Sequence, residues 1–336
     1  MKNLTVSLLL ALAAINWLSA PAVLAQGKYK CEEASTPLIS FVEFQSLDLE
    51  QSLPTPLTVK AKLSLPPGEA KMQGKAKGRT TRSEENCFNS KQPVPAVVIL
   101  HGSAGVDFRG DFYARALNAA GIATLEVDMW EARGVATAAD RPPLPIFTYP
   151  DAFAALRYLT SRSEIDPEKI GVLGFSWGGV ITMAAAEELY AGQFGGGLTF
   201  AAHAAHYPVC YGYNNPFIPP LNPPSERGTQ WLNLTGVPVL IQIGTEDDYD
   251  NGAENCISLK DDLLDPEDAQ QVEVVAYEGA YHAWDRLLAP ITVQDPFADE
   301  GSIFMTGMSP EVEIIHDVEQ AYESRDKVVE FFREAL

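Results

Sequence analysis

The sequence contains 336 residues, of which 46% are hydrophobic, and its formal net charge at pH 7 is −21. This length corresponds to one large domain or two small ones, and the apolar fraction is sufficient for a sizeable core. So acidic a chain repels phosphate backbones and anionic lipids, which argues against nucleic-acid binding and against docking on membranes through basic residues.

The first 25 residues have the composition of an export signal. Lys2 provides a positive charge, residues 6–15 are mostly apolar, and Val23-Leu24-Ala25 forms a small-residue cleavage site. We therefore predict cleavage after Ala25 and a secreted or periplasmic mature protein, with an uncut N-terminal anchor as the alternative. No later apolar run in the sequence is long enough to span a bilayer.

The cysteines fit an oxidising compartment. There are four, and none forms a Cys-x-x-Cys pair, which argues against zinc and thioredoxin-type sites. An even number favours two disulfides. We predict the pairs Cys31–Cys87 and Cys210–Cys256, because the first flanks the N-terminal strands and the second lies beyond two strand ends that should be neighbours. Buried free thiols are the alternative.

The N-terminal half alternates strands and helices. Apolar and polar residues alternate over 41–49 and 57–63, which predicts an antiparallel hairpin at the edge of a sheet. Residues 66–94 are polar and predict a long exposed loop. An unbroken apolar run predicts a buried parallel strand at 96–100, and the pattern continues with a helix at 111–120, a strand at 122–127 and a helix at 150–161.

The main functional signal in the chain is a Gly-x-Ser-x-Gly pattern formed by Gly174, Ser176 and Gly178. An apolar strand at 170–173 precedes it and a helix-forming run at 181–189 follows it. Strand, sharp turn and helix together are typical of a nucleophile elbow. The serine oxygen is then exposed, and the amide N–H of Trp177 points to where negative charge would develop.

The segment His101-Gly-Ser-Ala-Gly105 follows the strand at 96–100. Its small residues allow a backbone turn to approach the serine, so we assign a second N–H donor to Ser103. His101 could act as a base, but a buried histidine that fixes the loop is favoured, because a better base occurs later in the chain.

Three side chains at strand ends are candidates for substrate binding. Trp130 and Arg133 lie in the loop 128–134, and His206 ends the strand predicted at 198–206. Loops at this edge of an open α/β sheet line the ligand crevice. Arg133 could instead form an ion pair with Asp128 or Glu131, and His206 could simply be packed in the core.

The C-terminal half continues the pattern. Strands are predicted at 237–243 and 272–277, and an amphipathic helix at 317–336. Residues 208–235 are rich in Pro and Asn and predict a lid or wall over a pocket, while 286–315 predicts another long surface segment. The result is a mostly parallel sheet with helices on both faces.

Three reactive residue types then fall on successive strand ends: Ser176, an Asp at 247 or 248, and His282. A serine hydroxyl needs a neutral imidazole to take its proton, and the imidazolium that forms needs a carboxylate behind it. Asp247 is our choice because it lies three residues after Gly244, which leaves room for a turn; Asp248 and Glu246 are the alternatives.

Three motifs together resemble the dienelactone hydrolase family: Gly174-Phe-Ser-Trp-Gly-Gly179, Gly244-Thr-Glu-Asp-Asp248 and Gly279-Ala-Tyr-His-Ala-Trp284. The resemblance implies an α/β-hydrolase fold with about eight strands, and a single catalytic domain at 26–336 with insertions near 66–94, 208–235 and 286–315. It also implies a Ser176, Asp247 and His282 triad. The namesake enzymes use a cysteine nucleophile where this chain has Ser176.

The sequence therefore predicts a serine hydrolase that cleaves small carboxylic esters or lactones through an acyl-serine intermediate, without metal or cofactor. Two alternatives compete with it. A peptidase of the prolyl oligopeptidase kind shares Gly-x-Ser-x-Gly-Gly, and an inactive hydrolase fold could serve as a binding module. No sequence feature gives the oligomeric state.

Overall fold

The computed structural model describes residues 36–50, 53–67, 92–215 and 230–336. Its centre is an eight-stranded sheet in the order β1-β2-β4-β3-β5-β6-β7-β8. The strands are β1 (Leu38–Asp48), β2 (Thr55–Leu65), β3 (Val94–Leu100), β4 (Ala123–Asp128), β5 (Ile165–Phe175), β6 (Ala202–His206), β7 (Val239–Glu246) and β8 (Val272–Tyr281). The strands β3 to β8 run parallel, and β1 and β2 form an antiparallel hairpin that joins the sheet beside β4.

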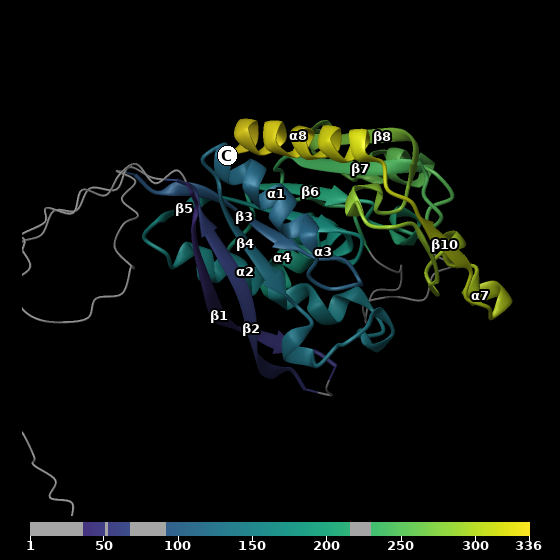
Figure 1. Cartoon of the computed structure of the whole chain (residues 1–336), viewed down its shortest axis with the longest axis horizontal. Coiled ribbons are helices and arrows are strands. Elements are labelled where there is room, and N and C mark those ends of the chain that lie inside the picture. Colours follow the sequence, from purple (N-terminus) through teal and green to yellow (C-terminus); the bar gives the residue numbers. More distant parts are fainter. Residues whose placement is uncertain (1–35, 51–52, 68–91, 216–229) are drawn as a thin grey trace, which may run out of the picture. The chain divides into compact units, whose positions relative to one another are not determined.

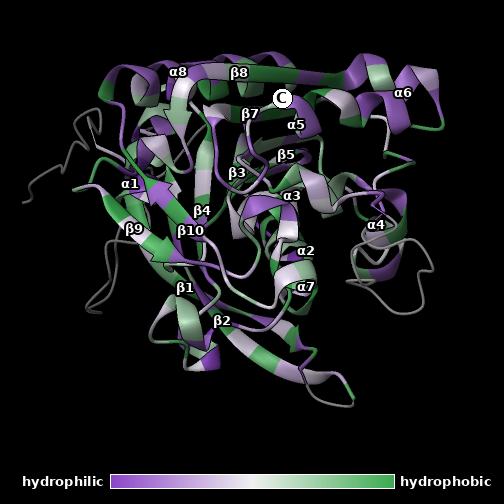
Figure 2. Ribbon diagram, turned by 90° about the vertical axis from the view of Figure 1, so that its right-hand side faces the viewer, coloured by the Kyte–Doolittle hydropathy of each residue, from purple (hydrophilic) through white to green (hydrophobic). Residues whose placement is uncertain are grey.

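Helices cover both faces of the sheet. One layer contains α1 (Phe108–Ala119) and α8 (Val318–Ala335), and the other contains α2 (Tyr149–Thr160), α3 (Trp177–Ala186) and α4 (Glu188–Phe194), as Figure 1 shows. The short helices α5 (Glu254–Ser258) and α6 (Pro266–Gln271) lie between β7 and β8 in the chain. In Figure 2, α8 carries both hydrophilic and hydrophobic residues, as expected of a helix with one buried face. The predicted architecture is confirmed.

The region after the elbow differs from the single helix that the sequence predicts. The helix breaks at Glu187, whose backbone is extended, and continues as α4. The buried Glu187 carboxylate accepts hydrogen bonds from the backbone N–H groups of Leu232 and Asn233. The break therefore directs this carboxylate to a loop that is distant in the sequence.

The segment 286–315 is more ordered than a surface loop. It contains β9 (Ile291–Gln294), α7 (Ile303–Thr306) and β10 (Glu311–Ile314), and β9 and β10 form a separate antiparallel pair. Short 3-10 helices complete the described chain at Glu131–Arg133, Ala138–Asp140, Pro145–Thr148, Cys210–Gly212, Leu259–Asp262, Trp284–Arg286 and Asp299–Gly301.

Several sequence predictions lie outside the described residues. These are the signal at 1–25, the pair Cys31–Cys87, most of the loop 66–94 and much of the lid 208–235. Within the described ranges, none of the helices has both the length and the apolar composition that a membrane crossing requires.

Candidate active site

Ser176 stands at a sharp turn between β5 and α3. Its backbone has φ 51° and ψ −109°, outside the regions that L-residues prefer. A Cβ on Gly174 would lie 2.0 Å from the carbonyl oxygen of Gly178, and one on Gly178 would lie 2.2 Å from that of Leu100. Only glycine fits at either position, so the turn is the elbow that the sequence predicts.

Ser176, His282 and Asp247 form a chain of hydrogen bonds. The Nε2 atom of His282 lies 2.9 Å from Oγ of Ser176, and its Nδ1 atom lies 2.8 Å from Oδ2 of Asp247. His282 and Asp247 are 3% and 1% exposed. A hydroxyl, an imidazole and a carboxylate from three separate strand ends are thus within bonding distance at one edge of the sheet.

The two alternative acids have other positions. The Asp248 carboxylate accepts a hydrogen bond from the backbone N–H of Glu313 in β10, and Glu246 is exposed at the end of β7. Asp247 also accepts from the backbone N–H of Tyr249, which fixes its second oxygen. Of these three carboxylates, Asp247 is the one that contacts the imidazole.

Two tyrosine rings hold the imidazole of His282. The ring centroids of Tyr249 and Tyr207 lie 4.3 and 4.7 Å from it. Tyr207 donates its hydroxyl proton to the buried carboxylate of Asp285 and accepts a hydrogen bond from Arg109. Sequence reasoning missed this support; the residues are far apart in the chain, and only the position of Tyr207 at the end of β6 signalled it.

The loop after β3 approaches Ser176 closely. A Cβ on Gly102 would lie 3.5 Å from the Cβ of Ser176, and Ser103 lines the space in front of the serine. Trp177 begins α3, so its N–H has no preceding helical turn to bond. This arrangement is compatible with N–H donors from Ser103 and Trp177, and their role stays a prediction.

His101 fixes that loop, as the favoured interpretation holds. Its Nδ1 lies 2.8 Å from the carbonyl oxygen of Gly102, and its Nε2 accepts from the N–H of Met129. Burial lowers the pKa of His101 to about 4. Both ring nitrogens are therefore engaged in structure, and His101 stays neutral at ordinary pH.

The three candidates for substrate binding have structural partners instead. The indole N–H of Trp130 donates to the carbonyl oxygen of Ser103, so this side chain supports the loop after β3. Arg133 forms a buried ion pair with Asp151 of α2, at 2.6 Å, and not with Asp128 or Glu131. Among the described residues, neither side chain lines the space in front of Ser176.

His206 is fully buried beneath the elbow. Its Nε2 lies 3.1 Å from the hydroxyl of Tyr113 and 3.0 Å from the amide nitrogen of Gln242, and its carbonyl oxygen accepts from the N–H of Ser176. It supports the nucleophile from below and is too deep to contact substrate, which corrects the expectation for this residue.

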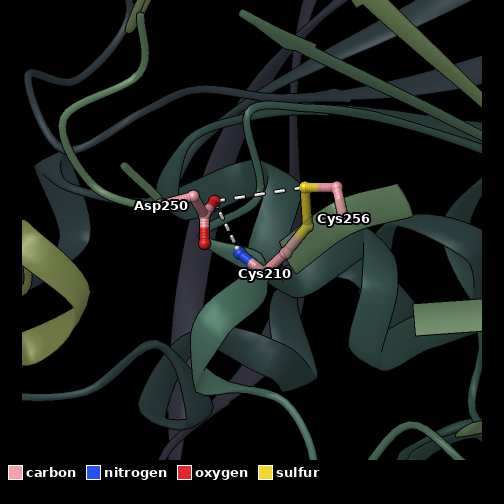
Figure 3. Close-up of side chains that lie close together, drawn as sticks. All are labelled: Cys210, Asp250 and Cys256. Atoms are coloured by element: carbon pink, nitrogen blue, oxygen red, sulfur yellow. Dashed lines mark hydrogen bonds between the residues drawn. A yellow bond between two sulfur atoms is a disulfide. The ribbon is translucent and has the colours of Figure 1, made fainter. Parts of the chain in front are cut away.

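A disulfide joins Cys210 to Cys256, beside the loop after β7 that carries Asp247. Figure 3 shows the carboxylate of Asp250 next to it; the same carboxylate accepts hydrogen bonds from the N–H groups of Cys210 and Tyr211. Burial and the nearby charge of Asp247 raise the pKa of Asp250 to about 8. Since the two sulfurs are bonded to each other, neither is available as a thiolate metal ligand.

A model of the family described as "Dienelactone hydrolase family" matches residues 86–336. The chain belongs to the dienelactone hydrolase family. Among curated proteins no match was found.

Solved structures of other hydrolases share the fold of this dienelactone hydrolase family member. Esterase 2 of Thermogutta terrifontis, phosphorylated by paraoxon, is 15% identical, with a TM-score of 0.51 over 90% of this chain and 95% of that one. An esterase of Pyrobaculum calidifontis is 15% identical, with a TM-score of 0.50 over 88% and 85%. A dipeptidyl aminopeptidase IV candidate from Bacteroides ovatus is 16% identical, with a TM-score of 0.54 over 89% and 36%. At these identities the likeness concerns the fold alone.

Two compartments meet at Ser176 in this family member. The first, here named the Trp177 compartment, is lined by Trp177, Val180, Val209, Tyr211, Tyr213 and Phe304. The second, the His282 compartment, is lined by Gly102, Ala104, Pro142, His282, Arg286 and Ile291. Six residues line both compartments: Ser103, Arg141, Ser176, Tyr249, Asp295 and Phe297. The sequence predicts roles for Trp177 and His282 and a wall from the segment 208–235, which contains Val209, Tyr211 and Tyr213. It does not indicate Val180, Phe304 or, apart from Ser103 and Ser176, the residues that line both compartments.

Proposed function

We propose that this protein is a serine hydrolase that cleaves carboxylic esters or lactones through an acyl-serine intermediate. The observation that carries the proposal is the hydrogen-bonded chain from Ser176 through His282 to Asp247, at 2.9 and 2.8 Å. Membership of the dienelactone hydrolase family supports hydrolysis as the reaction class.

The roles follow from the proton positions. With a proton on Nδ1, donated to Asp247, the Nε2 atom of His282 accepts the proton of Ser176 as its oxygen attacks the ester carbonyl. The imidazolium is stabilised by the Asp247 carboxylate and then protonates the leaving alcohol. A water molecule takes the place of the alcohol, gives a proton to His282 and attacks the acyl carbon. His282 then returns the proton to the oxygen of Ser176 as its bond to the acyl carbon breaks and the acid is released.

Backbone N–H groups supply the electrostatic part of this mechanism. The carbonyl oxygen becomes an oxyanion as Ser176 attacks, and in the proposal it accepts hydrogen bonds from the N–H groups of Trp177 and Ser103. A single donor of this kind typically contributes about 10²–10³-fold in rate. The hydrogen bond from Trp130 to Ser103 O and the bonds of His101 hold this loop in place before substrate arrives.

The test is hydrolysis of p-nitrophenyl acetate and butyrate by wild type and by Ser176→Ala. Wild type should turn over at least one of these esters, and the variant should lose nearly all of the rate. Equal rates in both proteins would contradict the proposal. A chromogenic Pro-containing peptide in the same panel distinguishes the esterase from a peptidase of the prolyl oligopeptidase kind. Cleavage of the peptide, with the esters left intact, would indicate the peptidase.

A further inference from the structure

The Trp177 and His282 compartments differ in their position relative to the imidazole of His282, and therefore in the part of an ester that each can hold. Both contain Ser176 and Ser103, but His282 lines only one of them. Because His282 must protonate the leaving oxygen, the alcohol of an ester has to leave on the side of the imidazole. In the proposed mechanism the carbonyl oxygen accepts from the N–H groups of Trp177 and Ser103 and the alcohol leaves beside His282. The remaining substituent of the carbonyl carbon, the acyl chain, then extends into the Trp177 compartment, which His282 does not line.

The walls of the Trp177 compartment are mostly apolar. Val180 comes from α3, Tyr211 and Tyr213 come from the segment after β6, and Phe304 comes from α7. The ionisable pair on its lining is Arg141 with Asp295, joined at 2.7 Å, so their charges compensate each other. Arg141 also lies over the Trp177 ring, 5.4 Å from its centroid. Such a wall favours an uncharged, apolar group.

The wall is fixed from several directions. The hydroxyl of Tyr211 donates to the carbonyl oxygen of Phe297, and its backbone N–H donates to the buried carboxylate of Asp250. The N–H groups of Asp299 and Glu300 donate to the carbonyl oxygens of Asp248 and Tyr249. The segment that carries Phe304 is therefore bonded to the loop that carries the acid of the triad, so the size of this compartment is set by the fold.

We infer that the Trp177 compartment is the acyl subsite and that it selects esters of apolar, uncharged monocarboxylic acids, with Val180 and Phe304 limiting the length of the acyl chain. The alcohol then occupies the His282 compartment. This inference rests on the proposed ester hydrolysis. It assigns a specificity role to segment 286–315.

The test is a series of p-nitrophenyl esters from acetate to decanoate, which share one leaving group. Val180→Phe places a ring in the Trp177 compartment and should lower the ratio of kcat/KM for octanoate to that for acetate about tenfold or more. Phe304→Ala removes a wall side chain that is 43% exposed, so folding should be retained, and should raise the same ratio several-fold. Met305→Ala, at a neighbouring residue of α7 that is 88% exposed, is the matched control and should leave the ratio unchanged.

A second series varies the alcohol at constant acetate. Ile291→Ala, on the wall of the His282 compartment, should change the preference among alcohols and leave the acyl series intact. An acyl-length profile that is the same in wild type, Val180→Phe and Phe304→Ala would overturn the inference while ester hydrolysis stands. So would a Val180→Phe effect confined to the alcohol series. Wild type that hydrolyses no ester would overturn the proposed function, and the inference with it.

Discussion

Asp247 and Asp248 are neighbours in the sequence, but their carboxylates contact different parts of the molecule. Asp247 contacts Nδ1 of His282 at 2.8 Å, and Asp248 accepts a hydrogen bond from the N–H of Glu313. The first carboxylate can orient and stabilise an imidazolium, and the second can hold segment 286–315 in place. The pair therefore allows a matched test of the triad acid.

Asp247→Asn should lower kcat for ester hydrolysis by roughly 10⁴-fold, because it removes the carboxylate that fixes the imidazole tautomer and stabilises its charge. Asp248→Asn should keep kcat within a few-fold of wild type, since it does not contact the imidazole. The measurement is steady-state kinetics of both purified variants. A larger loss of kcat in Asp248→Asn than in Asp247→Asn would show that Asp247 is not the acid of the triad.

At the scale of elements, the elbow depends on the close approach of α3 to the ends of β3 and β5. A Cβ on Gly178 would lie 2.2 Å from the carbonyl oxygen of Leu100 and 2.8 Å from that of His101. Backbone atoms at such distances have to move apart. The geometry of Ser176 therefore depends on this packing contact as well as on the contact between Gly174 and Gly178.

Gly178→Ala should lower the free energy of unfolding by about 2–3 kcal/mol, in the range of overpacked core sites, and should also reduce activity. Gly192→Ala is the control: it lies exposed in α4, a Cβ there meets nothing within 4 Å, and the change should stabilise by up to about 1 kcal/mol. Urea unfolding of both variants measures this. Equal changes in the free energy of unfolding for the two substitutions would show that the close approach at Gly178 does not contribute to stability.

Local signals in the sequence were strong for the central elements and weak for the walls of the site. The apolar run before Ser176 and the glycines around it predict β5, the elbow and the start of α3, because sterics act over a few residues. The short strands β9 and β10 have four residues each, and their pairing joins residues up to 23 apart (Ile291 with Ile314), so no local pattern shows it. For the same reason, Phe304 could not be placed beside Ser176, whereas Tyr213 lies in the segment 208–235 that the sequence predicts as a lid or wall.

Contacts with residues distant in the sequence also determine where the side chains expected to bind substrate lie. Arg133 has two acids in its own loop, Asp128 and Glu131, and proximity in sequence suggested one of them as its partner. The buried Asp151 of α2 is its partner instead. A desolvated ion pair of this kind requires both groups to be enclosed by the same core. Position at a strand end predicts proximity to the crevice, but the direction of the side chain depends on the tertiary packing.

At the scale of the whole molecule, buried histidines couple stability to pH. Burial lowers the pKa of His203 and of His206 to about 3, and that of His101 to about 4. Between these values and the unfolded pKa of about 6.5, the unfolded chain binds more protons than the folded one. The folded protein therefore loses stability progressively as the pH falls below about 6.5, and the loss is complete once the pH is below the folded pKa values of about 4 and 3.

His203→Leu should reduce the slope of unfolding free energy against pH, between pH 6 and 4, by about one proton, or about 1.4 kcal/mol per pH unit. Phe200→Leu, whose ring packs on His203 at 5.8 Å, loses packing without removing a titrating group and should keep the slope. Urea unfolding at several pH values gives both slopes. An unchanged slope in His203→Leu would contradict the lowered pKa of His203 in the folded protein.

The proposed mechanism requires that Ser176 becomes covalently acylated during turnover. Acid quenching during turnover of p-nitrophenyl butyrate, followed by mass spectrometry of the digested protein, tests it directly. We expect a butyryl adduct on the peptide that contains Ser176, and none on the corresponding peptide of Ser176→Ala. Sustained ester turnover with the adduct on another residue, or undiminished turnover by Ser176→Ala, would contradict it.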